Sequence, residues 1–393
     1  MNKKAFCMLI IATICTTMMW SAVSGNDRTA ATQLGDVDQN KIVNAEDALL
    51  VLKQAAKMIE LTDEQKMLGN VNKDQTEDAT DALWILQYAA GLYETFSSMN
   101  LPQRPDLIPE QLIPLQYAEK NTETSGSVIT IQYETKDYFG DEHVITKDAY
   151  VYLPPEYDET KQYNVMYLMH GVGGTKTEWM INRQDSHVKN YFDNLIALGE
   201  IEPIIAVFPT GRSCADYNDT SNNGMNENMN AFYLFGKELR NDLIPYIDAN
   251  FATYAEYEPG YDMTKARDHR AMAGFSMGGM QTVNIGICEC LDIISNFGAF
   301  SAAPTTYSAN QINEHLRAFG EFDIKLFYNV CGSSDATALG SHKAAVDGLV
   351  EGSGKRLMDH KNFIWHQVSG GHSMGVWYVG IYNFARMAFC DTL

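Results

Sequence analysis

The sequence predicts an α/β fold with a mostly parallel central sheet in its C-terminal part, preceded by a small all-α unit. Beyond residue 115, apolar strand-like runs alternate with amphipathic helical runs. Near the N-terminus, a loop-and-helix segment is repeated after 34 residues, and a stretch rich in proline and polar residues separates the two regions. The alternation indicates a parallel sheet, because each crossover between parallel strands needs a long connection, which is usually a helix.

The composition limits the class of protein. The chain has 393 residues, 45% of them hydrophobic, and a formal net charge of −21. It can therefore bury a sizeable core, and its negative charge repels nucleic acid and anionic membrane surfaces, so we expect neither as a partner. After the first 25 residues, no stretch reaches the roughly 20 apolar residues that a membrane span needs. The five cysteines beyond that point show no zinc-ligand spacing and predict no particular disulfide.

The first 25 residues predict a signal peptide. Lys3 and Lys4 are followed by an apolar run to Trp20 and then by small residues that include Ser24 and Gly25. This order of positive, apolar and small residues is typical of a segment removed on export. We therefore expect a secreted, extracellular protein.

The repeat predicts two calcium-binding loops, each followed by one helix. Segment 35–56 is echoed by segment 69–90. In both copies, oxygen-bearing side chains fall at loop positions 1, 3, 5, 9 and 12, which lets a twelve-residue loop converge on Ca²⁺, with a backbone carbonyl at position 7 as a further ligand. The expected ligands are Asp36, Asp38, Asn40, Ile42, Asn44 and Asp47 in the first loop, and Asn70, Asn72, Asp74, Thr76, Asp78 and Asp81 in the second.

The same residues have a simpler interpretation, because Asp and Asn also favour helix N-caps. Two copies in register, with matching helices, favour the metal instead. The loops depart from the usual pattern at position 6, where Lys41 and Gln75 replace glycine, and at position 12, where Asp replaces Glu. The second loop begins with the neutral Asn70, so we expect weaker binding there.

Residues 34–94, with their duplicated loop and helix, resemble a dockerin domain. The resemblance implies Ca²⁺-dependent folding and docking onto a cohesin module of a cellulosomal scaffold. Positions 10 and 11 of the loops help to choose the cohesin in that family, and here they are Ala45, Glu46, Ala79 and Thr80 rather than the common Ser-Thr pairs. The sequence therefore does not decide which scaffold the domain joins. Residues 95–114 predict a linker, and residues 115–393 the larger domain.

The motif GFSMGG places Ser276 between a strand-like run and a helix-like run. Strands are expected over 127–134, 148–154, 164–171, 204–210, 269–276, 325–332 and 362–371. Helices are expected over 187–200, 231–251 and 278–288. A serine on a strand-to-helix turn is the context of a nucleophile elbow, where Gly274 and Gly278 let the backbone turn sharply.

A base and an acid follow Ser276 in the chain. Asp335 lies on the loop after one expected strand and His372 on the loop after the next, and the order Ser, Asp, His is that of α/β-hydrolases. Asp335 has an alternative role as a helix cap, and Asp359 is a less favoured candidate for the acid because no strand delivers it. His366 falls inside a strand and is expected in the core.

Two backbone amides are expected to form an oxyanion hole, those of Met277 and Val172. Val172 follows the strand-like run 164–171 in the segment MYLMHGVGG, where we expect His170 to be structural. Trp377 and the loop 217–230 are candidates to line a substrate groove, with a place in the core as an equal alternative for Trp377.

The motifs YLMHGVGG, GFSMGG, GSSD and GGHSMGVW, in this order, resemble feruloyl esterases of carbohydrate esterase family one. The resemblance implies an α/β-hydrolase fold, with Ser276 as nucleophile, His372 as general base and acid, Asp335 as orienting carboxylate, and no cofactor for the chemistry. It implies hydrolysis of feruloyl esters on the arabinoxylan of plant cell walls. The same triad also suits an acetylxylan esterase, and a scaffold-docked, inert carbohydrate-binding protein is the alternative from another class.

Overall fold

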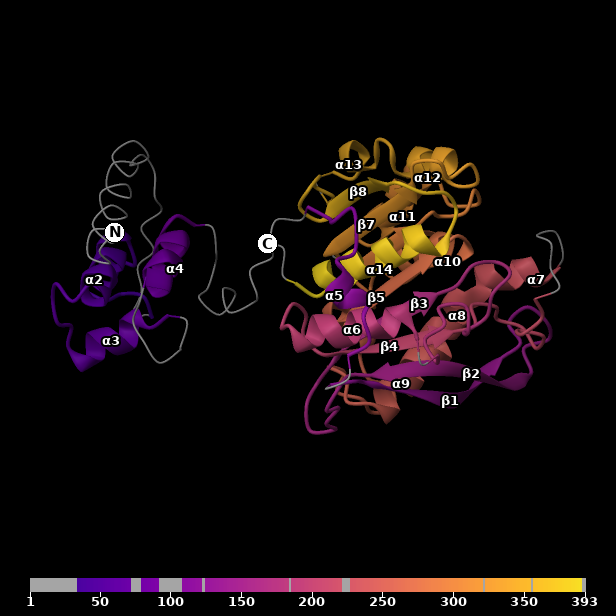
Figure 1. The fold of residues 1–393 in the computed structure, drawn as a ribbon, viewed down its shortest axis with the longest axis horizontal. Helices are drawn as coiled ribbons and strands as arrows, with labels where there is room; N and C mark the ends of the chain where they lie inside the picture. Colours follow the sequence, from indigo (N-terminus) through magenta and orange to yellow (C-terminus); the bar gives the residue numbers. More distant parts are fainter. Residues whose placement is uncertain are drawn as a thin grey trace. The chain divides into compact units, whose positions relative to one another are not determined.

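A computed structural model describes residues 34–71, 79–91, 108–121, 124–183, 185–220, 227–320, 322–354 and 356–390. The chain divides into two compact units, with the division between residues 103 and 104 (Figure 1). The expected signal peptide lies outside the described residues, as do residues 95–107 of the expected linker. Four expected ligands of the second loop also lie outside them: Asn72, Asp74, Thr76 and Asp78.

The smaller unit is helical in its described part. The two expected helices are present as α2 (Ala45–Ala55) and α4 (Ala79–Ala89), and a third, α3 (Asp63–Gly69), lies between them. Thr62 and Gln65 start α3 with a reciprocal capping box. Val37, Val51 and Ile85 are fully buried in the shared core. The apolar faces of the repeated helices therefore pack together, as their matched sequences predict.

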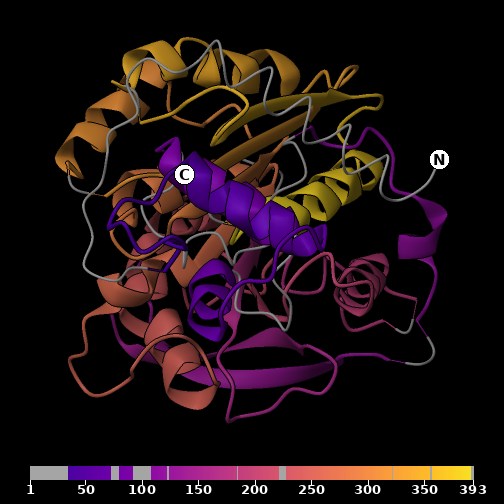
Figure 2. The same cartoon turned by 90° about the vertical axis from the view of Figure 1, so that its left-hand side faces the viewer.

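The larger unit is built on an eight-stranded sheet, with strand order β1-β2-β4-β3-β5-β6-β7-β8. Figure 1 shows β1 at the bottom of this sheet and β8 at the top, and the turned view in Figure 2 keeps the purple strands β1 and β2 at the bottom. β2 pairs antiparallel with β1 and with β4, and all other pairs are parallel. The strands are β1 (Ser127–Lys136), β2 (Val144–Leu153), β3 (Asn164–Met169), β4 (Ile204–Pro209), β5 (Arg270–Phe275), β6 (Asn296–Phe300), β7 (Leu326–Gly332) and β8 (Phe363–Val368). The predicted mostly parallel α/β fold is confirmed.

Helices cover both faces of this sheet, so the central strands are buried on both sides. One face packs against α5 (Leu115–Ala118), α6 (His187–Ala197) and α14 (Met374–Met387). The other packs against α8 (Phe235–Glu238), η3 (Leu239–Leu243), α9 (Ile244–Asn250), η5 (Thr282–Ile287) and α11 (Ala309–Ala318). The remaining short helices are α7 (Glu227–Asn230), η2 (Ala231–Leu234), η4 (Met263–His269), α10 (Met277–Gln281), α12 (Leu339–Val346) and α13 (Leu349–Gly352).

Seven of the eight strands were expected, and β6 was not. Its sequence, NFGAF, is short and has a glycine at its centre, which weakens a strand pattern. Gly298 is needed there because a Cβ atom would lie 2.9 Å from both Ala273 and Phe384. Among the described residues, no helix combines the length and apolar character of a membrane span. The five described cysteines are free thiols.

Candidate active site

Ser276 lies at the sharp turn between β5 and α10. Its backbone angles are φ 53° and ψ −116°, a region that residues other than glycine rarely adopt. The amide of Ser276 donates to the carbonyl of Phe300 at 2.9 Å, and its own carbonyl accepts from the amide of Ala303 at 2.9 Å. These two bonds hold the strained turn against β6 and the loop that follows it.

Gly274 and Gly278 are required by close approach of the backbone at this turn. A Cβ atom on Gly274 would lie 2.7 Å from the backbone of Gly278, and one on Gly278 would lie 2.6 Å from the carbonyl oxygen of Met169. Contacts this short do not occur between real Cβ atoms and their neighbours. The two glycines of the motif therefore permit the turn for the steric reason that the sequence suggests.

The structure brings Ser276, His372 and Asp335 together. The Nε2 atom of His372 lies 3.0 Å from the Oγ atom of Ser276, and its Nδ1 atom lies 2.9 Å from Oδ2 of Asp335. Since Asp335 is buried and its ionised carboxylate only accepts, Nδ1 carries the proton and Nε2 is left as an acceptor for the serine hydroxyl. This arrangement prepares a serine to lose its proton to a histidine.

Asp335 uses its two carboxylate oxygens for different partners. Oδ2 faces His372, whereas Oδ1 accepts from the amides of Thr337 at 3.0 Å and Ala338 at 2.8 Å. Burial raises the pKa of the Asp335 carboxyl, but the hydrogen bonds, led by the one to His372, outweigh burial and leave that pKa below its usual value. The helix-capping alternative and the pairing with His372 are thus both present.

The loops that carry the acid and the base are joined to each other. The amides of Ser333 and Ser334 donate to the carbonyls of Val368 and Gly370, at 2.7 and 2.9 Å. Asp359, the other acid considered, lies in the turn before β8 and pairs with the exposed His360 at 3.6 Å. The geometry therefore selects Asp335 as the partner of His372.

The amides expected to form an oxyanion hole lie on two elements beside Ser276. Met277 is the first residue of α10, so its amide has no acceptor within the helix. Val172 lies in the loop after β3 and packs against the apolar cluster that contains Met277. Two polar side chains, which the sequence analysis missed, fix this loop: the buried Arg212 and the partly exposed Glu178.

Arg212 and Glu178 hold the loop that carries Val172. The fully buried guanidinium of Arg212 donates to the carbonyl of Gly174 at 2.8 Å and to that of Val172 at 2.5 Å. The carboxylate of Glu178 accepts from the amide of Gly171 at 3.0 Å. A charged residue three positions after the apolar run of β4 is the signal in the sequence that could have found Arg212.

The other histidines near the site are structural. His170 is buried, and burial lowers the pKa of its imidazole to about 3. Its Nδ1 atom donates to the carbonyl of Gly171 at 2.7 Å, and Nε2 accepts from the amide of Gly211 at 3.0 Å. His366 is buried and bonds the hydroxyl of Tyr328 at 2.7 Å. Both therefore match the structural roles expected from their positions.

Apolar side chains surround the turn of Ser276. Phe232, Met277, Met280 and Ala303 form a buried cluster, against which the partly exposed Val172, Met229 and Tyr233 pack. Trp377 is a core residue rather than an exposed platform, because only 7% of its surface is exposed and its ring stacks on Phe275 at 4.1 Å. Residues 221–226 of the expected groove loop lie outside the described residues.

The first expected calcium loop gathers three carboxylates. Oxygens of Asp36, Asp38 and Asp47 lie within 4.8 Å of one another. Asp36 Oδ1 is buried and has no hydrogen-bond partner, which leaves it suited to a cation. Lys41, at position 6, adopts φ 75°, so the loop makes the sharp turn that usually needs glycine at this position. The loop residues therefore fit Ca²⁺. Of the second set, Asp81 is fully buried.

Comparison with protein families agrees with both parts of the chain. Residues 34–89 match the model of the dockerin type I domain, and residues 146–312 match the model described as putative esterase. This chain carries a dockerin type I domain followed by an esterase-family domain. Both domain resemblances inferred from the sequence motifs are confirmed.

The esterase domain is similar to modules of xylan-degrading enzymes. The chain is 32% identical over 212 residues to endo-1,4-beta-xylanase Y of Acetivibrio thermocellus and 37% identical over 141 residues to an endo-1,4-beta-xylanase/feruloyl esterase of Xylanibacter ruminicola. These matches cover 52% and 34% of this chain, and only 18% and 16% of the relatives. The chain thus spans less than a fifth of each relative.

Solved structures agree with this similarity. A mutant of the feruloyl esterase module from Clostridium thermocellum, complexed with sinapinate, is 26% identical, with a TM-score of 0.56, over 74% of this chain and 96% of that one. A CE1 ferulic acid esterase from Anaeromyces mucronatus has a TM-score of 0.58 at 21% identity, over 72% of this chain and 97% of that one. The second match supports the fold alone.

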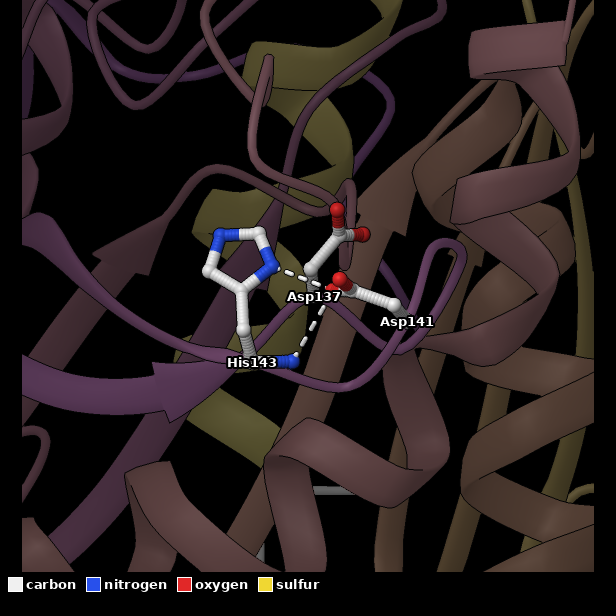
Figure 3. A group of neighbouring side chains, drawn as sticks. All are labelled: Asp137, Asp141 and His143. Atoms are coloured by element: carbon white, nitrogen blue, oxygen red, sulfur yellow. Dashed lines mark hydrogen bonds and ion pairs between the residues drawn. The ribbon is translucent and has the colours of Figure 1, made fainter.

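A separate group of titratable side chains lies in the β1–β2 hairpin of the esterase domain. Figure 3 shows His143 joined to Asp141, with Asp137 beside them. The hydrogen bond to Asp141 raises the pKa of the His143 imidazole. Asp137 accepts from the amide of Gly140 at 2.8 Å, and Asp141 from that of His143 at 3.2 Å. These carboxylates serve the turn, and we assign them no function.

Proposed function

We propose that this chain is a secreted serine esterase that hydrolyses feruloyl and related hydroxycinnamoyl esters on arabinoxylan. The observation that carries the proposal is the hydrogen-bonded chain of Ser276, His372 and Asp335 on a strained strand-to-helix turn. In the reaction, Nε2 of His372 takes the hydroxyl proton as Ser276 Oγ attacks the ester carbonyl. The amides of Met277 and Val172 stabilise the oxyanion.

Collapse of the first tetrahedral intermediate expels the sugar alcohol, which receives the proton from His372, and leaves an acyl-enzyme on Ser276. His372 then takes a proton from water, which attacks the acyl-enzyme and releases the acid. Asp335 holds the imidazole in the tautomer that both steps need and stabilises its charged form. Its lowered pKa keeps the carboxylate ionised at neutral pH.

The apolar cluster supports an aromatic acyl group over acetyl. Val172, Met229 and Tyr233 are partly exposed and pack on the buried Met277, which directly follows the nucleophile. An aromatic ring placed there removes apolar surface from water, a gain that an acetyl group is too small to obtain. The similarity to the feruloyl esterase module supports the same choice.

The dockerin domain supports a place on a scaffold. We propose boundaries of 1–25 for the signal peptide, 34–94 for the dockerin, 95–114 for the linker and 115–393 for the esterase. Ca²⁺ held by the first loop, and by the second through ligands that include Asn70 and Asp81, would order the loops that precede α2 and α4 and so permit binding to a cohesin module. Export and cohesin binding together imply an extracellular cellulosome.

The test is ester hydrolysis by the purified protein and its Ser276→Ala variant, with methyl ferulate and acetylated xylan as substrates. We expect ferulate release from the wild type and a loss of at least about 10⁴-fold in the variant, because the nucleophile is gone. Acetate release alone would retain the triad and change the function to xylan deacetylation. Hydrolysis of neither substrate, with retained binding to arabinoxylan, would favour an inert carbohydrate-binding protein.

A further inference from the structure

An open cavity of about 570 Å³ lies along β1, at the edge of the sheet. Its lining includes Gln132, Glu134, Asn241, Tyr246, Asn250 and Tyr257, and none of the residues that surround Ser276. In the strand order, β1 is four positions from β5, which delivers Ser276. At about 4.8 Å per strand, the cavity is roughly 19 Å from the nucleophile's strand. It is therefore separate from the candidate active site.

Residues of the strand β1 and of the helical segment formed by η3 and α9 line the cavity together. The hydroxyl of Thr135 donates to Asp242 at 2.7 Å, and the rings of Tyr133 and Tyr246 are 6.0 Å apart. These two contacts place the strand antiparallel to the helical segment. The lining stretches 132–136 and 241–250 both extend about 13 Å, at the usual rise per residue of strand and helix. A groove of this shape suits an extended chain.

The lining is chemically suited to a neutral sugar chain. Gln132, Asn241 and Asn250 supply amides, which both donate and accept, as sugar hydroxyls do. Tyr246 and Tyr257 add phenol rings, and Tyr257 is 43% exposed. Exposed phenol rings pack against the apolar faces of sugar rings while their hydroxyls stay hydrated.

The charges of the lining argue against an anionic ligand. Glu134 and Asp242 contribute two carboxylates, against the single ammonium of Lys136. The formal charge of the whole chain, −21, acts in the same direction. An anionic chain would therefore be repelled from the groove, whereas a neutral polysaccharide would not.

We propose that this groove binds the unesterified backbone of a neutral polysaccharide, as a site distinct from the one that holds the acyl group. The identity of the polymer, arabinoxylan, rests on the proposed function. A polymer held along β1 raises the local concentration of its ester-bearing branches near Ser276 without entering the reaction. An extended peptide can also pair with the free edge of β1, but the amides and phenols of the lining favour a glycan.

The test uses the full chain with the Ser276→Ala substitution, so that the polymer stays intact. In that background, the pair Tyr257→Ala and Asn250→Ala is compared with Tyr254→Ala by affinity electrophoresis in arabinoxylan. Tyr254 is a matched control, because it is 37% exposed and stacks on His269 rather than lining the groove. We expect the pair to bind about tenfold more weakly, equivalent to about 1.4 kcal/mol, and the control to bind normally.

The same pair in the active enzyme separates the groove from the catalytic chemistry. We expect unchanged kcat/KM on methyl ferulate and about tenfold slower ferulate release from dilute arabinoxylan. Arabinoxylan binding that is unchanged in the pair, or equally weakened in the Tyr254→Ala control, would overturn the proposal. If the wild type hydrolyses no ester, the proposed function fails, yet binding by the inactive variants still decides whether the groove holds the glycan. Unfolding temperatures of all variants establish that each is folded.

Discussion

At the scale of the residue, the two oxygens of the Asp335 carboxylate have different hydrogen-bond partners, and this difference leads to a specific prediction. In the wild type, Oδ1 of Asp335 accepts hydrogen bonds from the backbone amides of Thr337 and Ala338. In Asp335→Asn, the side-chain oxygen must take over this role, because only an oxygen can accept from these amides. Its NH₂ group then faces Nδ1 of His372 and forces the proton onto Nε2. A protonated Nε2 in the neutral ring cannot accept from Ser276, so we expect kcat to fall by about 10⁴-fold with little change in KM.

The measurement is steady-state hydrolysis of methyl ferulate, and Asp359→Asn is its control. Asp359 is exposed and pairs with His360 in the turn before β8, so its loss should leave kcat unchanged. A large effect of Asp359→Asn, or a small one of Asp335→Asn, would show that another acid orients the base.

The sequence predicted these residues because each follows an expected strand in an order that hydrolases share. It did not predict Arg212 or Glu178, since their role depends on contacts with the loop after β3, and in the case of Arg212 these contacts cross about forty residues of chain. The sequence also did not decide whether Trp377 lines the substrate groove or lies in the core. Only the packing against Phe275 settles that question, and no local pattern encodes it.

At the scale of the element, the loop that carries Val172 depends on one buried guanidinium. Arg212→Lys keeps the positive charge but loses the planar fork that reaches the carbonyls of both Val172 and Gly174. We expect the loop to shift and kcat to fall by about 100-fold, the lower end of the roughly 10²- to 10³-fold cost of losing one oxyanion donor, while KM changes less than about threefold. Stopped-flow measurement of acylation on an activated ester of ferulate reads this step directly.

Arg240→Lys is the matched control for that substitution. Arg240 makes a similar forked pair, with Asp292 at 2.6 and 2.8 Å, but none of its bonds reaches the loop. Normal acylation in Arg212→Lys, or equal slowing in both variants, would remove Arg212 from the positioning of the oxyanion loop.

Elements were predicted best where the local pattern is strong. The runs that became β3, β4 and β7 are mostly apolar and are buried along their whole length, and parallel strands covered on both faces give this signal. β6 was missed because Gly298 is chosen by contact with Ala273 and Phe384 rather than by strand propensity. α3 was missed because it lies between the repeats and has no counterpart to reveal it.

At the scale of the whole molecule, the two units have different requirements for stability. The esterase domain has a large two-sided core around its sheet. The dockerin domain has a small core, and its first loop gathers Asp36, Asp38 and Asp47 without a compensating side-chain cation among the ion pairs of the described residues. Mutual repulsion of these carboxylates opposes the folded loop unless a cation neutralises it.

Removal of Ca²⁺ by a chelator should therefore affect the two units differently. With excess chelator, we expect the dockerin helices to lose far-UV circular dichroism and cohesin binding to disappear, while methyl ferulate hydrolysis is unchanged, since the proposed mechanism uses no metal-bound group. Added Ca²⁺ should restore the helices, and Asp36→Ala should need more Ca²⁺ for the same recovery because it removes the buried ligand that has no other partner. Helices that resist chelation would contradict the metal assignment. A metal that binds only the folded dockerin stabilises that unit alone. A parallel loss of hydrolysis on chelation would therefore mean that the esterase domain depends on the calcium loops.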